Sequence, residues 1–144
     1  MTPDINVLVA AFHRDHAHHR VARGWLEQTV VACERGQRLL LLPMVCAGFL
    51  RVVTHARVFS LPAPARDATA FIDALLTVPG CEWLHLGNEW PAFARLCAQR
   101  GLAGNLVQDA WIAMAVRGHG AHLITFDRDF GSLLEAHEFT LLRP

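Results

Sequence analysis

Four of the aspartates stand where a carboxylate is costly unless something neutralises it. Asp4 lies where a very short strand is expected to give way to a helix. Asp127 and Asp129 close the apolar run 121–126, which has the length of a buried parallel strand. Asp109 lies one turn into a helix that is apolar almost all the way round. Because an ionised carboxylate taken out of water costs several kcal/mol, it normally shifts its pKa, pairs with a cation or binds a metal.

Each acid also has a simple structural interpretation when it is taken alone. Aspartate is a favoured helix N-cap, which suits Asp4. Asp109 can lie on the one solvent-exposed edge of its helix. The interpretation changes when Asp4, Asp109 and Asp127 are taken together, because parallel α/β sheets place their sites at the carboxyl ends of the strands. Three acids on one edge repel one another unless a cation holds them. All-oxygen ligands suit Mg²⁺ or Mn²⁺ better than Zn²⁺, so the sequence predicts a Mg²⁺ or Mn²⁺ site at this edge.

The elements that must position these acids alternate between strands and helices along the chain. Besides the strand at the start and the run 121–126, strands are predicted over residues 38–42, 82–86 and 139–142. Helices are predicted after Asp4, behind Asn105 as an N-cap, and over residues 17–35, 44–55, 67–78, 90–101 and 130–135. Such alternation implies parallel pairing. We therefore predict one domain, residues 1–144, with an α/β fold: a three-layer α/β/α sandwich around a mainly parallel central sheet.

Composition narrows the class of protein further. The chain is 53% apolar and 18% charged with a formal net charge of zero, which is typical of a compact domain and provides no global basic field for nucleic acid. No apolar run approaches the roughly 18 residues of a membrane span. The four cysteines are widely spaced, without a C-x-x-C pair, so we expect free thiols and a cytoplasmic protein.

A histidine-rich segment, residues 13–20, is the most unusual local composition. His13, His16 and His19 recur every third residue, a spacing that drifts around a helix, whereas metal-binding pairs usually stand four residues apart. We therefore interpret the segment as a solvated loop and the start of a helix, with metal binding as the second interpretation. The tryptophans are predicted to pack in the core: Trp25, Trp83, Trp90 and Trp111.

Several motifs, taken in order, resemble one family over essentially the whole chain. They are PDINVL at the start, GFLRVVTHARVF in the middle, and NLVQDAWIA and LITFDRDF near the end. This pattern resembles the PIN-domain ribonucleases, and within them the VapC-type toxins of type II toxin–antitoxin pairs. The resemblance implies an endoribonuclease that depends on Mg²⁺ or Mn²⁺ and cleaves structured RNA such as tRNA, rRNA or mRNA. It also implies a homodimer and a small antitoxin that blocks the site.

The resemblance assigns roles to individual residues. Asp4, Asp109 and Asp127 match the metal-binding acids of the family, and Asp129 matches a further acid often found beside them. Asn6 and Thr125 match polar residues that brace the site. One residue departs from the pattern: most members carry a glutamate in the helix after the second strand, and Gly48 stands at that position.

Two functional hypotheses remain open at this stage. In the first, a metal activates water for attack on the scissile phosphate, Asp127 or Asp129 orients that water, and arginines of the same rim bind phosphate. In the second, the loss of an acid at Gly48 leaves a catalytically weak module that binds RNA or its antitoxin without efficient turnover. The candidate phosphate-binding arginines are Arg51, Arg57 and Arg128.

Overall fold

Short parallel strands run through the middle of the molecule. The computed structural model describes residues 1–143, so the last residue of the predicted domain, Pro144, lies outside the described residues. The strands are β1 (Thr2–Pro3), β2 (Leu39–Leu41), β3 (Cys81–Trp83), β4 (Leu123–Thr125) and β5 (Phe139–Leu141). They pair in the order β1-β4-β5 and, separately, β2-β3, and each of these pairings is parallel. Met1 connects the two groups, because its carbonyl oxygen accepts a hydrogen bond of 2.8 Å from the backbone N–H of Leu40.

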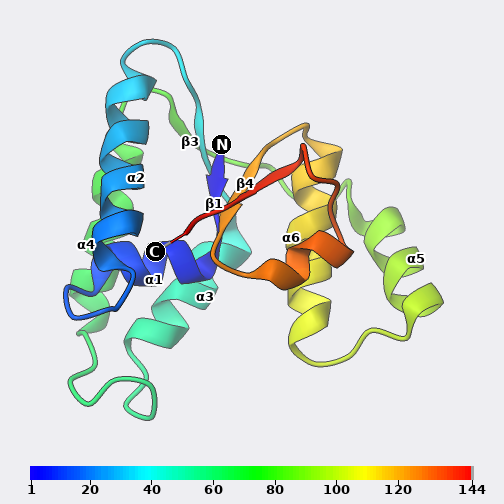
Figure 1. Cartoon of the computed structure of the whole chain (residues 1–144), viewed down its shortest axis with the longest axis horizontal. Helices are drawn as coiled ribbons and strands as arrows, with labels where there is room; N and C mark the ends of the chain where they lie inside the picture. Colours follow the sequence, from blue (N-terminus) through cyan, green and yellow to red (C-terminus); the bar gives the residue numbers. More distant parts are fainter. Residues whose placement is uncertain (144) are drawn as a thin grey trace.

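Helices cover the strands on both sides. They are α1 (Ile5–Phe12), α2 (His19–Cys33), α3 (Pro43–Val53), α4 (Ala65–Leu76), α5 (Trp90–Arg100), α6 (Asn105–Gly118) and the short 3₁₀ helix η1 (Arg128–Ser132). Figure 1 shows α2 and α4 on one side of the strands and α5 and α6 on the other. The predicted parallel α/β fold with helices on both faces is confirmed.

The core explains why these segments hold their places. β2 and Leu42 are buried throughout, and α6 buries Ala110 and residues 112–116. Between α1, α3 and α4, the rings of Phe12, Phe49 and Phe71 pack against one another, with Phe12 lying 5.4 Å from each of the other two ring centroids. Aromatic rings contribute large apolar areas, so this cluster holds α1 and α3, which follow β1 and β2 in the chain, against α4.

Some predicted boundaries were wrong, for identifiable reasons. The predicted strand 121–126 is longer than β4, because residues 123–125 alone find partners, two of them on β1 and all three on β5. The N-cap of α6 is Gly104, at φ 59° and ψ −133°, and not Asn105, which is the first helical residue. Glycine adopts such a conformation without the steric cost that a Cβ would add. The short helix predicted over 130–135 instead forms earlier, as η1, because the side chain of Asp127 caps it.

The tryptophans do not all lie in the core. Trp25 and Trp111 are half-buried, but Trp83 is 41% exposed and Trp90 is 64% exposed. Trp83 lies on β3, which pairs only with β2 within the described residues, and Trp90 begins α5 at the edge of the molecule. Apolar periodicity cannot tell an edge element from a central one, which is why the prediction failed for these two residues.

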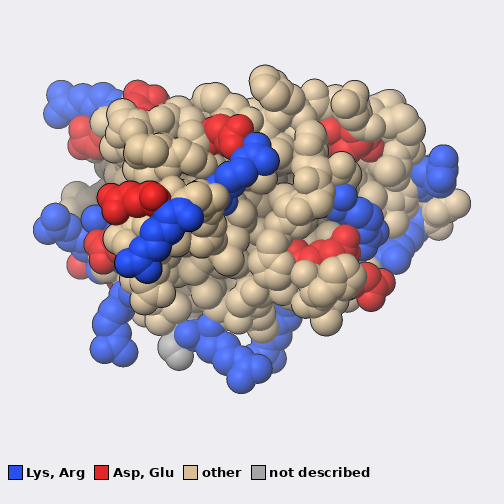
Figure 2. Space-filling view, turned by 90° about the horizontal axis from the view of Figure 1, so that it is seen from above, with Lys and Arg blue, Asp and Glu red and all other residues tan. Residues whose placement is uncertain are grey.

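The surface shows no dominant charge on the face drawn in Figure 2, where acidic and basic side chains are mixed among a larger uncharged area. This agrees with the formal net charge of zero. All four cysteines are free, and burial raises the pKa of the Cys46 thiol to about 12. Within residues 1–143, no helix is both long and apolar enough to cross a membrane.

Candidate active site

A cavity of about 550 Å³ opens beside the carboxyl ends of β1 and β4. Three of the four predicted acids contribute to its wall, and they come from three parts of the chain: Asp4, Asp109 and Asp127. The other polar side chains of the wall are Asn6, His16, Arg51, Asn105 and Gln108, and its apolar part consists of Ile5, Val9, Val52, Val58 and Phe59. The carboxyl edge of the sheet therefore does bring the predicted acids to one cavity.

Asp4 is the most buried of these acids. It follows β1 as the N-cap of α1, and its side chain is 5% exposed. Its Oδ1 accepts a hydrogen bond of 2.6 Å from the Ile5 backbone N–H, and its Oδ2 accepts one of 2.8 Å from the Thr125 hydroxyl. Burial, followed by the charges of Asp109 and Asp127, raises the pKa of Asp4 from 3.8 to about 6, although the two hydrogen bonds lower it.

Thr125 is the centre of a hydrogen-bond network that joins the two ends of the chain. Besides donating to Asp4, its fully buried hydroxyl oxygen accepts from Asn6 Nδ2 at 3.1 Å and from the Asp127 backbone N–H at 2.9 Å. Asn6 Oδ1 also accepts from the Phe126 backbone N–H at 3.2 Å. The network fixes the end of β4 against the start of α1, so it determines where Asp4 and Asp127 stand relative to each other.

Asp109 and Asp127 form the more open wall of the cavity. Asp109 is half-buried on α6, and burial raises its pKa, followed by the charges of Asp127 and Asp129. Asp127 is half-buried as well, and its Oδ1 accepts a hydrogen bond of 2.8 Å from the Asp129 backbone N–H. The acids therefore interact electrostatically, which is the behaviour expected of carboxylates that share one site.

Not every predicted site residue lies in the wall. Asp129 is exposed just beyond it on η1, although its charge acts on Asp109. Among the arginines, Arg51 is exposed and lines the cavity, whereas Arg57 and Arg128 are exposed outside the wall. The direct candidates for phosphate contact at this cavity thus reduce to Arg51 among the three arginines.

Sequence reasoning missed three polar residues of the wall, which are His16, Asn105 and Gln108. A usable signal existed for two of them. Asn105 and Gln108 precede Asp109 by four and one positions on α6, and residues three or four apart in a helix share a face. A polar stripe on an otherwise apolar helix therefore pointed to this wall. His16 had no such signal, because its place depends on the conformation of a loop.

Gly48 shows how the wall is built at the position where the resemblance implies a glutamate. It is buried on α3, and a Cβ added there would overlap with Cδ1 of Ile5 and lie 3.1 Å from Nε2 of Gln108. Both neighbours line the cavity. The volume next to Gly48 is thus already filled, so the missing glutamate reflects a repacked wall and not an empty position.

The donor set fits a hard divalent cation, because carboxylate and amide oxygens dominate the polar wall. Each Asp4 oxygen accepts one hydrogen bond and retains a second lone pair for a ligand. Within residues 1–143, however, no three His, Cys, Asp or Glu side chains form a group that could hold a metal ion. Mutual repulsion keeps ionised carboxylates apart, so a cation would have to draw Asp4, Asp109 and Asp127 together.

A carboxylate-lined cavity at the strand ends of a parallel α/β fold is a site of the kind that metal-assisted hydrolases of phosphate esters use. Comparison with known proteins identifies the family. The model of the PIN domain matches residues 1–133. Ribonuclease VapC31 of Mycobacterium tuberculosis is 34% identical over 134 residues, which are 88% of this chain and 88% of that protein. Ribonuclease VapC43 of the same organism is 38% identical over 128 residues, covering 88% of this chain and 85% of that protein.

Solved structures agree with this fold. VapBC2 from Rickettsia felis, bound to a DNA fragment from its promoter, matches with a TM-score of 0.67 and 17% identity over 99% of this chain and 98% of that one. VapC20 of Mycobacterium tuberculosis matches with a TM-score of 0.60 and 18% identity over 94% and 98% of the two chains. The chain belongs to the PIN-domain family and, within it, to the VapC-type ribonuclease toxins, which confirms the predicted family and reaction class.

Proposed function

We propose that this endoribonuclease cleaves structured RNA with a Mg²⁺ or Mn²⁺ ion held by Asp4, Asp109 and Asp127. The observation that carries the proposal is that these acids, from three separate parts of the chain, line one cavity. The charges of Asp109 and Asp127 raise the pKa of Asp4, and the charge of Asp127 also raises the pKa of Asp109. Bound there, the ion would activate a water molecule and offset negative charge at the scissile phosphate.

The residues around the ion would have distinct tasks. Thr125 and Asn6 hold Asp4 and the start of η1 in place through hydrogen bonds. Asp127 or Asp129 would accept the proton of the attacking water, and Asp127 has the better position because it lines the cavity. Arg51 would bind a phosphate oxygen of the RNA, since a guanidinium is well suited to phosphate and this one lies in the wall.

Relatives support the proposed biological setting. VapC20 is described as a toxin that cleaves the sarcin–ricin loop, a structured RNA, and VapBC2 is described as a complex on promoter DNA. By analogy, we expect a small antitoxin partner that covers the cavity, and a homodimer. The free cysteines are consistent with action in a reducing cytoplasm.

The alternative function is an RNA- or antitoxin-binding module with little turnover. Gly48 favours it, because the wall has one acid fewer than in most of the family and Ile5 and Gln108 fill the volume. The two functions differ in whether the remaining acids suffice for cleavage.

Cleavage of total cellular RNA by purified protein, free of antitoxin, distinguishes them. The reaction is run with Mg²⁺, with Mn²⁺ and with EDTA, using the natural protein, Asp109→Asn and the matched control Asp73→Asn. Asp73 is exposed on α4, outside the cavity. We expect discrete fragments that require a metal, persist with Asp73→Asn and disappear with Asp109→Asn. Folded protein that yields no fragments in either metal would favour the binding module.

A further inference from the structure

We propose that His16 contacts the RNA backbone directly, donating a hydrogen bond from Nε2 to a phosphate oxygen beside the scissile bond. This proposal rests on the proposed function, because it assumes that RNA enters the cavity that holds the acids. His16 lines that cavity, but it lies on the loop between α1 and α2, which carries none of the predicted catalytic residues.

The loop determines which nitrogen of His16 carries the proton. The backbone N–H of His18 donates to His16 Nδ1 at 3.1 Å, so Nδ1 is the acceptor and a neutral ring has its hydrogen on Nε2. Within residues 1–143, Nε2 makes no hydrogen bond. It is also not fully buried, so it remains accessible to a ligand. Burial and then the neighbouring histidines lower the pKa of His16, which favours the neutral ring over the charged one. The ring thus presents a free donor at the cavity.

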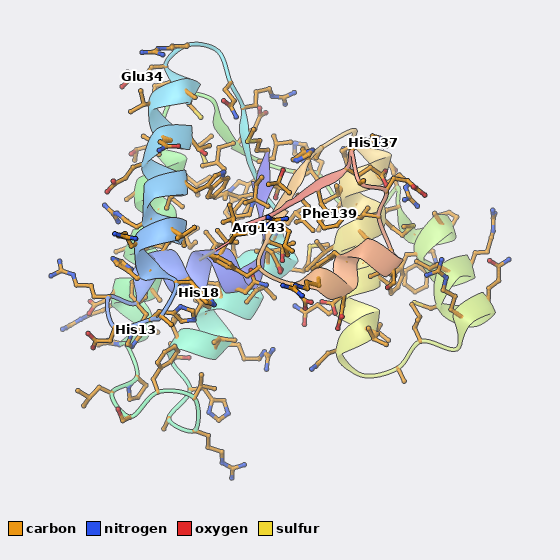
Figure 3. The ribbon with its side chains drawn as sticks, in the orientation of Figure 1. His13, His18, Glu34, His137, Phe139 and Arg143 are labelled. Atoms are coloured by element: carbon orange, nitrogen blue, oxygen red, sulfur yellow. The ribbon has the colours of Figure 1, made fainter. Side chains whose placement is uncertain are left out.

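Stacked rings hold the loop on both sides of His16. His13 stacks on Phe59 with centroids 4.1 Å apart and planes 13° apart, and His18 stacks on Phe126 at 4.8 Å and 27°. Figure 3 labels both histidines on the loop next to α1. His19 Nδ1 lies 2.8 Å from the carbonyl oxygen of Ala10 and fixes the start of α2. The segment predicted as a solvated loop and the start of a helix is a loop up to His18 and begins α2 at His19, but its histidines are half-buried and ordered by tertiary contacts.

The charge of the cavity explains why a donor is needed there. Three carboxylates repel a phosphodiester unless donors and a cation face them. Asn6 Nδ2 gives one of its two N–H groups to Thr125, and the other amides of the wall, Asn105 and Gln108, belong to α6. The wall near the loop is apolar, with Val58 and Phe59. Arg51 on α3 and His16 on the α1–α2 loop come from different elements, so together they can hold a phosphate group from two directions.

Two substitutions separate substrate contact from loop structure. In His16→Asn, the side-chain oxygen can replace Nδ1 as the acceptor for His18 N–H, but the donor at Nε2 is lost. In His16→Gln, the longer amide can replace the Nε2 donor, but the bond to His18 is lost. His85→Asn is the matched control, because His85 is an exposed histidine outside the cavity. Each variant is tested for binding of labelled total RNA in EDTA and in Ca²⁺, so that affinity is measured without and with a divalent cation. Cleavage in Mg²⁺ and the Tm are measured as well.

We expect His16→Asn to bind RNA about tenfold more weakly, which corresponds to about 1.4 kcal/mol, with a Tm equal to that of His85→Asn. His16→Gln should retain RNA affinity within about threefold of the natural protein, despite a lower Tm. Equal affinity of His16→Asn and the natural protein would overturn the proposal. So would losses in both His16 variants that simply follow their Tm, since these would indicate a structural role.

The outcome is separable from that of the proposed function. In one outcome, the natural protein cleaves, Asp109→Asn does not, and His16→Asn binds and cleaves normally. This outcome would support the proposed nuclease and refute the role of His16. If no protein cleaves but His16→Asn still binds RNA about tenfold more weakly, the nuclease fails and the contact of His16 with RNA is supported.

Discussion

The two sides of the cavity are built differently. On the closed side, Asp4, Asn6 and Thr125 form a network in which Asp4 and Thr125 are buried and each side chain hydrogen-bonds within the protein. On the open side, Asp109 is half-buried and, within residues 1–143, its carboxylate accepts no hydrogen bond. The side chains of the closed side find hydrogen-bond partners within the folded protein, whereas the open side keeps a carboxylate available for a ligand.

This difference separates two tasks that the acids share. The closed side ties β1, α1 and β4 together and sets the geometry, so a change there should affect stability as well as activity. The open side contributes charge to the cavity at little benefit to the fold, because burial and neighbouring acids oppose the ionised form of Asp109. A change on the open side should therefore affect activity alone.

The largest expected effect is on the open side, in Asp109→Asn. Loss of one metal-binding carboxylate should lower kcat by about 10²–10³-fold, the size associated with removing one preorganised electrostatic contact. The free energy of unfolding should be unchanged or higher, since the amide removes repulsion from Asp127 and Asp129. The measurements are cleavage rate in Mg²⁺ and urea unfolding in EDTA. A variant that loses both activity and stability would contradict the division between the two sides.

On the closed side, Thr125→Val removes the hydroxyl at the centre of the network. The substitution leaves Asp4 Oδ2, Asn6 Nδ2 and the Asp127 N–H without their partner, so unfolding free energy should fall by about 2–4 kcal/mol. Urea unfolding measures the loss. The matched control is Thr29→Val, because Thr29 is also buried but its hydroxyl bonds only to the Trp25 carbonyl oxygen within its own helix. Equal losses in the two variants would mean that the network contributes no more than an ordinary buried threonine.

The same contrast explains how much of the site could be predicted from sequence. The positions of Asp4 and Asp127 follow from strand ends, which apolar runs reveal, and the parallel fold follows from the alternation of elements. Asn105 and Gln108 were detectable as a polar stripe with Asp109 but were overlooked. The place of His16 could not be predicted, because its loop is held by Phe59 and Phe126, which are distant in the sequence.

Strand lengths and the cavity wall at Gly48 are two further properties that the sequence alone could not predict. A strand ends where its partners end, so β4 is paired only over the three residues that β5 matches, two of which also pair with β1. The sequence of the strand itself does not reveal this length. The sequence likewise showed that an acid is missing at Gly48, but only packing shows that Ile5 and Gln108 occupy the volume. Both properties arise from contacts between separate segments.

The pH dependence of stability provides a further test of the closed side. The pKa of Asp4 is raised from 3.8 to about 6 in the folded protein, so the folded state binds the proton more tightly than the unfolded state. The resulting stabilisation is complete below about pH 4 and is lost as the pH rises through about 6, with a size of up to about 3 kcal/mol.

Comparison with Asp4→Asn isolates this contribution from groups whose effect on stability has the opposite pH dependence. Glu138 is one of them, because Arg117 lowers its pKa to about 2. Between pH 7 and pH 4, natural protein should gain stability relative to Asp4→Asn in urea unfolding with EDTA present. Asp73→Asn, on the exposed face of α4, should show no such relative change. A constant difference between natural protein and Asp4→Asn across this range would mean that Asp4 is better solvated than its burial indicates.

The smallest expected effect concerns Gly48, which lies where the two sides meet, between Ile5 of α1 and Gln108 of α6. Alanine is favoured over glycine inside a helix by about 0.5–1 kcal/mol. Gly24 on α2 has open space where a Cβ would lie, so Gly24→Ala should be more stable than the natural protein by that amount. Gly48→Ala should be less stable than Gly24→Ala by about 1 kcal/mol, because its Cβ must displace Ile5 and press on Gln108. Since both neighbours line the cavity, Gly48→Ala should also slow cleavage, whereas Gly24→Ala should not. Equal stabilisation of both variants with unchanged cleavage would show that the wall accommodates a Cβ at this position at little cost.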